Sequence, residues 1–308
     1  MKKVWILVGL LAWIPSAWSQ QEPLLSMSFQ NKLVYNPAYA GSRGQLSFMG
    51  GGRRQWVGFE GAPQQEAFSL HLPTSDGRNG LGATVVSDRN MYSSRVSCAG
   101  NYAYRIPIGK AHLAMGLRLG LANYRLRTTE IDVWDNGDPA FESTLGDFSK
   151  WMAVAGTGLY LQHPRFYFGA SIPDLLPHKL YDTYYEELTA QSRWHHYFMA
   201  GLSLPLGNHV FFRPNAMLRV VKGAPTSLDL NAGFWFYRSV SVAASWRPGQ
   251  AVAFQTELYV DQGLRLGYSY DYPIGQTRSL GGAAHELFVG FDLSLFTQKG
   301  TREEAFIH

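Results

Sequence analysis

The feature that most limits the fold of this chain is a strict alternation of apolar and polar residues. In the segment 111–124, Leu113, Leu117 and Leu121 share one face, while Arg118 belongs to the other. The same alternation recurs in 227–236, 264–272 and 286–296. Successive side chains of a β-strand point to opposite faces, so this period of two predicts strands with one apolar and one polar face.

Composition separates a membrane barrel from a β-sandwich in water. Charged residues make up 16% of the chain, whereas about 25% is usual in a soluble domain. The polar faces combine Gly, Ser and Asn with balanced charges and hold almost no Lys, which suits a crowded, hydrated lumen. Beyond residue 19, no run approaches the roughly 18 apolar residues of a membrane helix. We therefore predict an all-β, closed, transmembrane antiparallel β-barrel.

Counting the alternating segments predicts about fourteen strands. They are 44–56, 64–72, 79–88, 93–105, 111–126, 151–160, 166–172, 195–204, 210–221, 227–236, 240–246, 251–260, 264–272 and 285–296. The even-numbered connections are all short, and the three long ones, 127–150, 173–194 and 273–284, are all odd-numbered. Outer-membrane barrels have short periplasmic turns and longer surface loops, so this parity supports the count and predicts that both termini are periplasmic.

The first twenty residues predict that the protein is exported from the cytoplasm. Lys2 and Lys3 precede the apolar run 4–14, and Ala17-Trp18-Ser19 supplies small residues before a cleavage site at Gln20, the pattern of a secretory signal peptide. We predict four segments. They are a signal peptide at 1–19, a periplasmic or lumenal N-terminal segment at 20–43, the barrel at 44–296 and a periplasmic tail at 297–308.

No pattern in the chain indicates an enzyme, a cofactor or a metal site. The cluster Asp132–Asp138 lacks the ligand spacing of an EF-hand loop and fits a solvated turn. His195 and His196 are adjacent on a strand and point to opposite faces, so they are poorly placed to share a metal. His71 and His112 alternate inward, away from the wall position that a barrel phospholipase needs. The net charge of +4 is too small to indicate a nucleic-acid partner.

Charged residues on the polar faces predict the chemistry of the lumen. They are Arg118, Arg213, Arg219, Asp229, Glu257, Arg265, Asp271, Glu286 and Asp292. Such groups can line the constriction of a porin, or they can pair internally and fill the barrel. Fourteen strands lie between barrels filled by side chains and open porins, so both alternatives remain.

Two runs near the N-terminus punctuate the first strand. In Asn36–Ser42, Pro37 lacks an N–H and Gly41 tolerates turns closed to other residues, which predicts a rigid chain reversal. Gln55–Pro63 follows the strand and predicts its first surface hairpin, with Trp56 at the membrane interface.

These runs, together with Asn31, resemble the PorP/SprF family of outer-membrane proteins in the type IX secretion and gliding machinery of Bacteroidota. Ser28 and Lys32 depart from the family pattern. The resemblance carries over to one set of positions, read as structural or partner-contact residues. They are Asn31, Asn36, Pro37, Ala38, Tyr39, Gly41, Arg54, Gln55, Trp56, Gly58, Gly61, Ala62 and Pro63.

The resemblance implies a non-enzymatic protein of the outer membrane, surrounded by its lipid. Two roles are open: anchoring the periplasmic secretion or gliding complex, or partnering a secreted adhesin-like surface protein. The N-terminal segment is the expected contact for machinery, and the long loops are the expected contact for a surface protein. A porin or solute transporter is the alternative from another class.

Overall fold

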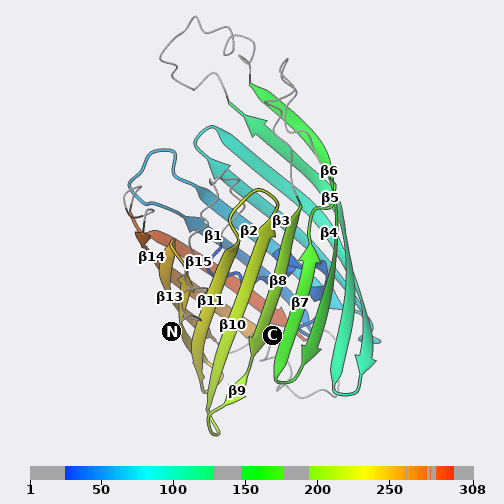
Figure 1. Cartoon of the computed structure of the whole chain (residues 1–308). Coiled ribbons are helices and arrows are strands. Elements are labelled where there is room, and N and C mark those ends of the chain that lie inside the picture. Colours follow the sequence, from blue (N-terminus) through cyan, green and yellow to red (C-terminus); the bar gives the residue numbers. More distant parts are fainter. Residues whose placement is uncertain are drawn as a thin grey trace, which may run out of the picture.

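A computed structural model describes residues 25–127, 147–176, 194–260, 263–275, 278 and 282–294. These residues form a closed antiparallel β-barrel with strands tilted around its axis (Figure 1). The predicted fold class and the count of fourteen wall strands are therefore confirmed. The wall has fifteen labelled strands because β8 continues as the two-residue β9, and both pair with β10.

The observed strands follow the predicted segments closely. Their bounds are β1 Leu46–Arg54, β2 Gln64–Pro73, β3 Asn79–Asn90, β4 Ser93–Ile108, β5 Ala111–Leu126, β6 Phe148–His163, β7 Phe166–Ile172, β8 His195–Leu202, β9 Leu204–Pro205, β10 Val210–Val221, β11 Ser227–Phe236, β12 Val240–Arg247, β13 Ala251–Tyr259, β14 Leu264–Pro273 and β15 Ala284–Leu293. β4 and β6 run several residues past the predicted ends.

The barrel closes between its first and last strands. β1 pairs with β15 from Leu46 opposite Leu293 to Arg54 opposite His285, and its other edge pairs with β2. Closure satisfies the backbone N–H and C=O groups of both strands, which a lipid environment cannot do.

The two ends of the barrel differ in their connections. We call the end with the turns 74–78, 109–110, 164–165, 206–209, 237–239 and 260–263 the short-turn end. The opposite end, uppermost in Figure 1, carries the connections 127–147, 173–194 and 274–283 and is called the long-loop end. Assigning the short-turn end to the periplasm remains a prediction.

The outer face of the wall is apolar. Leu117 is 59% exposed and Leu119 is 71% exposed, while Arg118 between them is 7% exposed. The alternation found in the sequence is therefore an inside–outside alternation, with the apolar set placed where lipid would contact it. Within the described residues, no helix is both long and apolar enough to cross a membrane.

The lumen is filled by residues 25–43, which we call the plug segment. All of them are buried except Gln30, which is partly exposed. The segment includes a one-turn helix, α2 (Lys32–Tyr35), and a 3₁₀ turn, η1 (Pro37–Tyr39). Its side chains form one apolar cluster with wall residues that include Tyr160, Tyr167 and Met217. The hydrophobic core of this membrane barrel therefore lies inside its lumen.

Glycine in the wall lets the plug segment approach closely. A Cβ added to Gly116 of β5 would stand 2.1 Å from the backbone nitrogen of Ala38. A Cβ added to Gly80 of β3 would stand 2.0 Å from the carbonyl oxygen of Ala40. Backbone packs directly on backbone at both positions, so a side chain cannot be added without moving the plug segment.

The substitution Gly116→Ala tests this packing. We expect it to lower the free energy of unfolding by about 1–3 kcal/mol, because η1 must shift to admit the methyl group. Gly100→Ala is the matched control: Gly100 lies on the outer face of β4, and its added Cβ would have 3.9 Å to the nearest atom. Urea titration of the detergent-solubilised barrel measures both. Equal stabilities of the two variants would contradict the close approach.

Candidate functional site

The residues singled out by the sequence occupy two elements of the structure. Asn31, Asn36, Pro37, Ala38, Tyr39 and Gly41 lie in the plug segment and are buried. Arg54 ends β1, and Gln55–Pro63 forms the connection to β2 at the long-loop end, which we call the first hairpin loop. The two groups differ sharply in their access to a partner.

Asn36 organises the middle of the plug segment. Its Oδ1 accepts a hydrogen bond from the N–H of Ala38 at 2.9 Å, which caps η1. Its Nδ2 donates to the carbonyl oxygen of Leu159 in β6 at 2.9 Å. Pro37 occupies the first position of η1, where no N–H is needed. One side chain thus caps the turn and attaches it to the wall.

The plug segment is also fixed where it reaches the short-turn end. Gly41 adopts a φ of 69°, and its N–H donates to Nδ1 of His71 at 3.0 Å. Arg105 donates to the carbonyl oxygens of Ala40 and Gly77. His71, which alternates inward as expected, is therefore a structural acceptor for the plug segment.

Arg118 completes the C-terminal end of α2. Its Nη1 donates to the carbonyl oxygen of Val34 at 2.8 Å, and its Nη2 donates to that of Leu33. Ser171 donates to the carbonyl oxygen of Tyr35 at 2.8 Å. Helix carbonyls left without intrahelical partners need such donors, and a cation is favoured there. The Arg118 guanidinium therefore binds the plug segment rather than facing an open channel.

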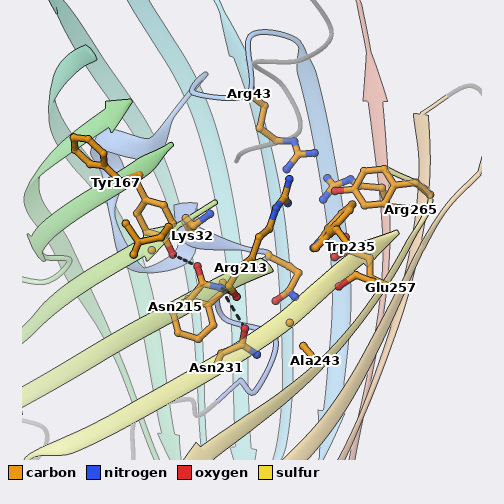
Figure 2. A pocket seen from close by; sticks show the side chains of 18 residues that line it. Lys32, Arg43, Tyr167, Arg213, Asn215, Asn231, Trp235, Ala243, Glu257 and Arg265 are labelled. Atoms are coloured by element: carbon orange, nitrogen blue, oxygen red, sulfur yellow. Dashed lines mark hydrogen bonds between the residues drawn. The ribbon is translucent and has the colours of Figure 1, made fainter. Parts of the chain in front are cut away.

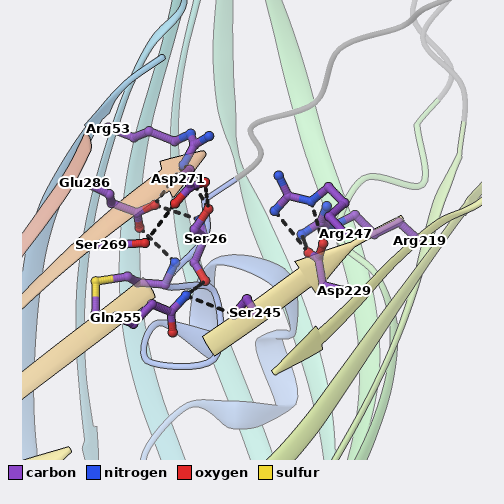
Figure 3. Close-up of polar contacts among 11 residues, drawn as sticks. Ser26, Arg53, Arg219, Asp229, Ser245, Arg247, Gln255, Ser269, Asp271 and Glu286 are labelled. Atoms are coloured by element: carbon purple, nitrogen blue, oxygen red, sulfur yellow. Dashed lines mark hydrogen bonds and ion pairs between the residues drawn. The ribbon is translucent and has the colours of Figure 1, made fainter. Parts of the chain in front are cut away.

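A polar network holds the start of the plug segment near the long-loop end (Figure 3). Glu286 accepts from the N–H groups of Ser26 at 2.7 Å and Met27 at 3.1 Å. Arg53 donates to Asp271 at 2.6 Å and to the Ser26 hydroxyl at 2.8 Å. The segment is therefore tied to the wall at both ends of the lumen.

The remaining lumen charges form further groups. Arg219 and Arg247 both bind Asp229, the second cluster in Figure 3. Arg43 and Arg265 both bind Asp292. Arg43 and Arg247 were missed from the sequence because each lies just outside a predicted strand. Arg53 was missed because it follows the glycines 50–52, which show no apolar–polar alternation. Arg213 and Glu257 line a cavity described below.

The first hairpin loop is held by one backbone hydrogen bond within itself and by two to neighbouring connections. The Gln55 N–H donates to Pro63 O at 3.0 Å, and the Met91 N–H donates to Gly61 O at 2.9 Å. The Val57 N–H donates to Ala283 O at 3.1 Å. The loop therefore bridges the β3–β4 turn and the β14–β15 connection.

Apolar side chains stand out from this loop. Val57 and Phe59 are each 52% exposed, and neighbouring Met91 is 49% exposed. We call these three residues the apolar patch. Trp56 is partly exposed and has a φ of 49°, a strained conformation for a large residue. A rigid loop that presents apolar side chains at a barrel rim has the character of a binding surface.

The other candidates do not assemble into a catalytic or metal site in the described part of the chain. Among those residues, no group of three His, Cys, Asp or Glu side chains is placed to hold a metal ion. His195 and His196 are both half-buried at the start of β8. The acidic cluster Asp132–Asp138 lies outside the described residues.

Replacing Asn36 by Ala tests its double role. Loss of the cap leaves the buried N–H of Ala38 without its acceptor, and the attachment to Leu159 is lost as well, so we expect a loss of about 1–3 kcal/mol in the free energy of unfolding. Asn31→Ala is the matched control, because Asn31 is buried in the same segment but its side chain does not cap α2. Urea titration should show the larger loss for Asn36→Ala; a larger loss for Asn31→Ala would contradict the assignment.

Comparison with known proteins finds one matching protein family and several solved structures that are similar to this chain. A family model described as "Type IX secretion system membrane protein PorP/SprF" matches residues 17–291. No curated protein matches the chain. Similar solved structures include Omp33 of Acinetobacter baumannii, at 8% identity and a TM-score of 0.47 over 81% of this chain and 98% of that one. The toluene transporter TbuX of Ralstonia pickettii is similar at 10% identity and a TM-score of 0.49, over 84% and 92%.

Proposed function

The chain belongs to the PorP/SprF family of type IX secretion system membrane proteins, and we propose that it acts there as a filled outer-membrane scaffold that binds a partner protein at its long-loop end. Neither the family nor the fold is that of an enzyme class. The observation that carries the proposal is the plug segment, which occupies the lumen and leaves the rim for binding.

The filled lumen argues against a diffusion pore. Two lumen cavities have volumes of about 60 Å³ and about 40 Å³. Cavities of this size are small local pockets beside the plug segment and do not amount to a path for a solute. A solute transporter would have to move a segment that is bound to the wall at Glu286, Asn36 and Arg105.

Burial of the plug segment also supports one partner role over the other. Its motif residues face the lumen, so a complex assembling at the periplasmic side would not reach them without displacing the segment. The apolar patch, in contrast, is exposed at the long-loop end, which we predict to face the cell surface because outer-membrane barrels carry their longer loops there. This favours a secreted surface protein as the partner over an anchoring role in the periplasm.

The double substitution Val57→Ser/Phe59→Ser tests the proposed docking surface. We expect it to reduce at least tenfold the amount of secreted type IX cargo protein that co-purifies from native membranes, because the apolar contact area is lost. Ile108→Ser/Leu206→Ser is the matched control, since those residues are 53% and 57% exposed but lie at the short-turn end. Mass spectrometry of the purified complexes provides the measurement. If both double variants retain the same partners, the apolar patch is not the docking surface.

Conductance in planar bilayers tests the filled lumen against the porin alternative. We expect the intact protein to show no steady open state, because the plug segment blocks the path. Deleting residues 25–40 should produce stable channels, with far-UV circular dichroism confirming that the barrel still folds. A steady, porin-sized conductance of the intact protein would refute the scaffold proposal.

A further inference from the structure

A cavity of about 60 Å³ lies between the plug segment and the wall formed by β10 to β14. Figure 2 shows its lining, to which Lys32 comes from α2, Arg213 from β10 and Glu257 from β13. Arg43 and Arg265 close its other side. Filling the lumen does not by itself require a cavity lined by so many charged groups.

The charges around the cavity do not balance. Arg43 and Arg265 share a single carboxylate, Asp292, at 2.8 Å and 2.9 Å. Among the described residues that line the cavity, Glu257 is the one carboxylate available to Lys32 and Arg213, and the guanidinium of Arg213 also lies over the Trp235 ring, 4.2 Å from its centroid. Four basic groups therefore stand against two carboxylates, an excess of positive charge in a space where unpaired charge is costly.

Several polar atoms that line the cavity lack partners. Nε of Arg213 and Oε1 of Glu257 are buried without a hydrogen-bond partner. The Lys32 ammonium lies over aromatic rings, 4.4 Å from the Tyr167 centroid and 5.4 Å from the Tyr39 centroid. Glu257 is 3% exposed, as is Lys32. A buried donor such as Nε of Arg213 normally has an acceptor, and none of the described residues supplies one.

The environment of Lys32 shows the same excess of positive charge. Burial, and after it the neighbouring guanidinium groups of Arg43 and Arg213, lower the pKa of its ammonium group to about 7. A negative group in the cavity would oppose these effects by pairing with the ammonium and with Arg213.

We propose that this cavity binds one small oxyanion, held between Lys32 of the plug segment and Arg213 of the wall. The volume fits a single tetrahedral oxyanion or one carboxylate group, and the side-chain amides of Asn215 and Asn231 also line it. Partly exposed Arg213 and Tyr259 lie toward the short-turn end, which offers an approach from water. The bound anion would connect α2 to β10 and hold the plug segment in place.

Thermal unfolding of the full mature protein in detergent micelles tests the site. The probes are sodium selenate, for a free tetrahedral oxyanion, and sodium acetate, for a carboxylate group, each at constant ionic strength. We expect a saturable rise in the unfolding midpoint with one of them, as a ligand that binds the folded state requires. Selenate alone would identify a free oxyanion, and acetate alone a carboxylate. No saturable rise with either would overturn the proposal.

Two substitutions locate the effect. Arg213→Gln should weaken the response at least tenfold, while Arg247→Gln, which removes a buried lumen arginine paired with Asp229, should leave it unchanged. If Arg213→Gln fails to fold, Lys32→Met serves instead. Crystals soaked in selenate should show an anomalous peak within hydrogen-bonding distance of the Lys32 ammonium and Arg213. Equal responses of the wild type and Arg213→Gln, or a selenate peak elsewhere only, would overturn the assignment.

Discussion

A barrel of fourteen strands encloses more space than its own inward side chains fill, and in this protein the plug segment occupies that space. The constraint is polar as well as steric. A buried segment without long helices exposes N–H and C=O groups that must all find partners. Glu286, Asn36, Arg118 and Arg105 provide them at successive levels of the lumen. The wall and the plug segment therefore depend on each other for satisfied hydrogen bonds.

Several charged side chains of the lumen share one role, which is to hold the plug segment against the wall. In a porin, charged groups on the inner wall face water and set ion selectivity. Here Arg118 and Arg105 bind backbone carbonyls, and Arg53 pairs with Asp271 beside the plug segment. Such groups contribute little net stability compared with apolar packing, but they fix one position of the segment because an unpaired buried charge is strongly unfavourable. The short-turn half keeps an excess of positive charge, which the proposed anion would offset.

The sequence predicts the wall far better than the interior. β5 and β11 match their predicted bounds residue for residue, because lipid on one side and lumen on the other impose a period of two. β6 begins earlier than predicted, at Phe148, where a long connection obscured the pattern. The position of the plug segment could not be read from residues 25–43, since α2 and η1 are too short to show a period. Pro37 and Gly41 predict a rigid reversal, but its contacts come from strands distant in sequence.

Hydrogen–deuterium exchange of the purified protein in micelles measures the central claim most directly, because amides buried in a filled lumen exchange only when the segment leaves it. Peptides covering residues 25–43 should be protected to an extent similar to those covering β4 and β5. Exchange of the 25–43 amides within seconds, while the strands stay protected, would show that the segment does not fill the barrel and would contradict the account.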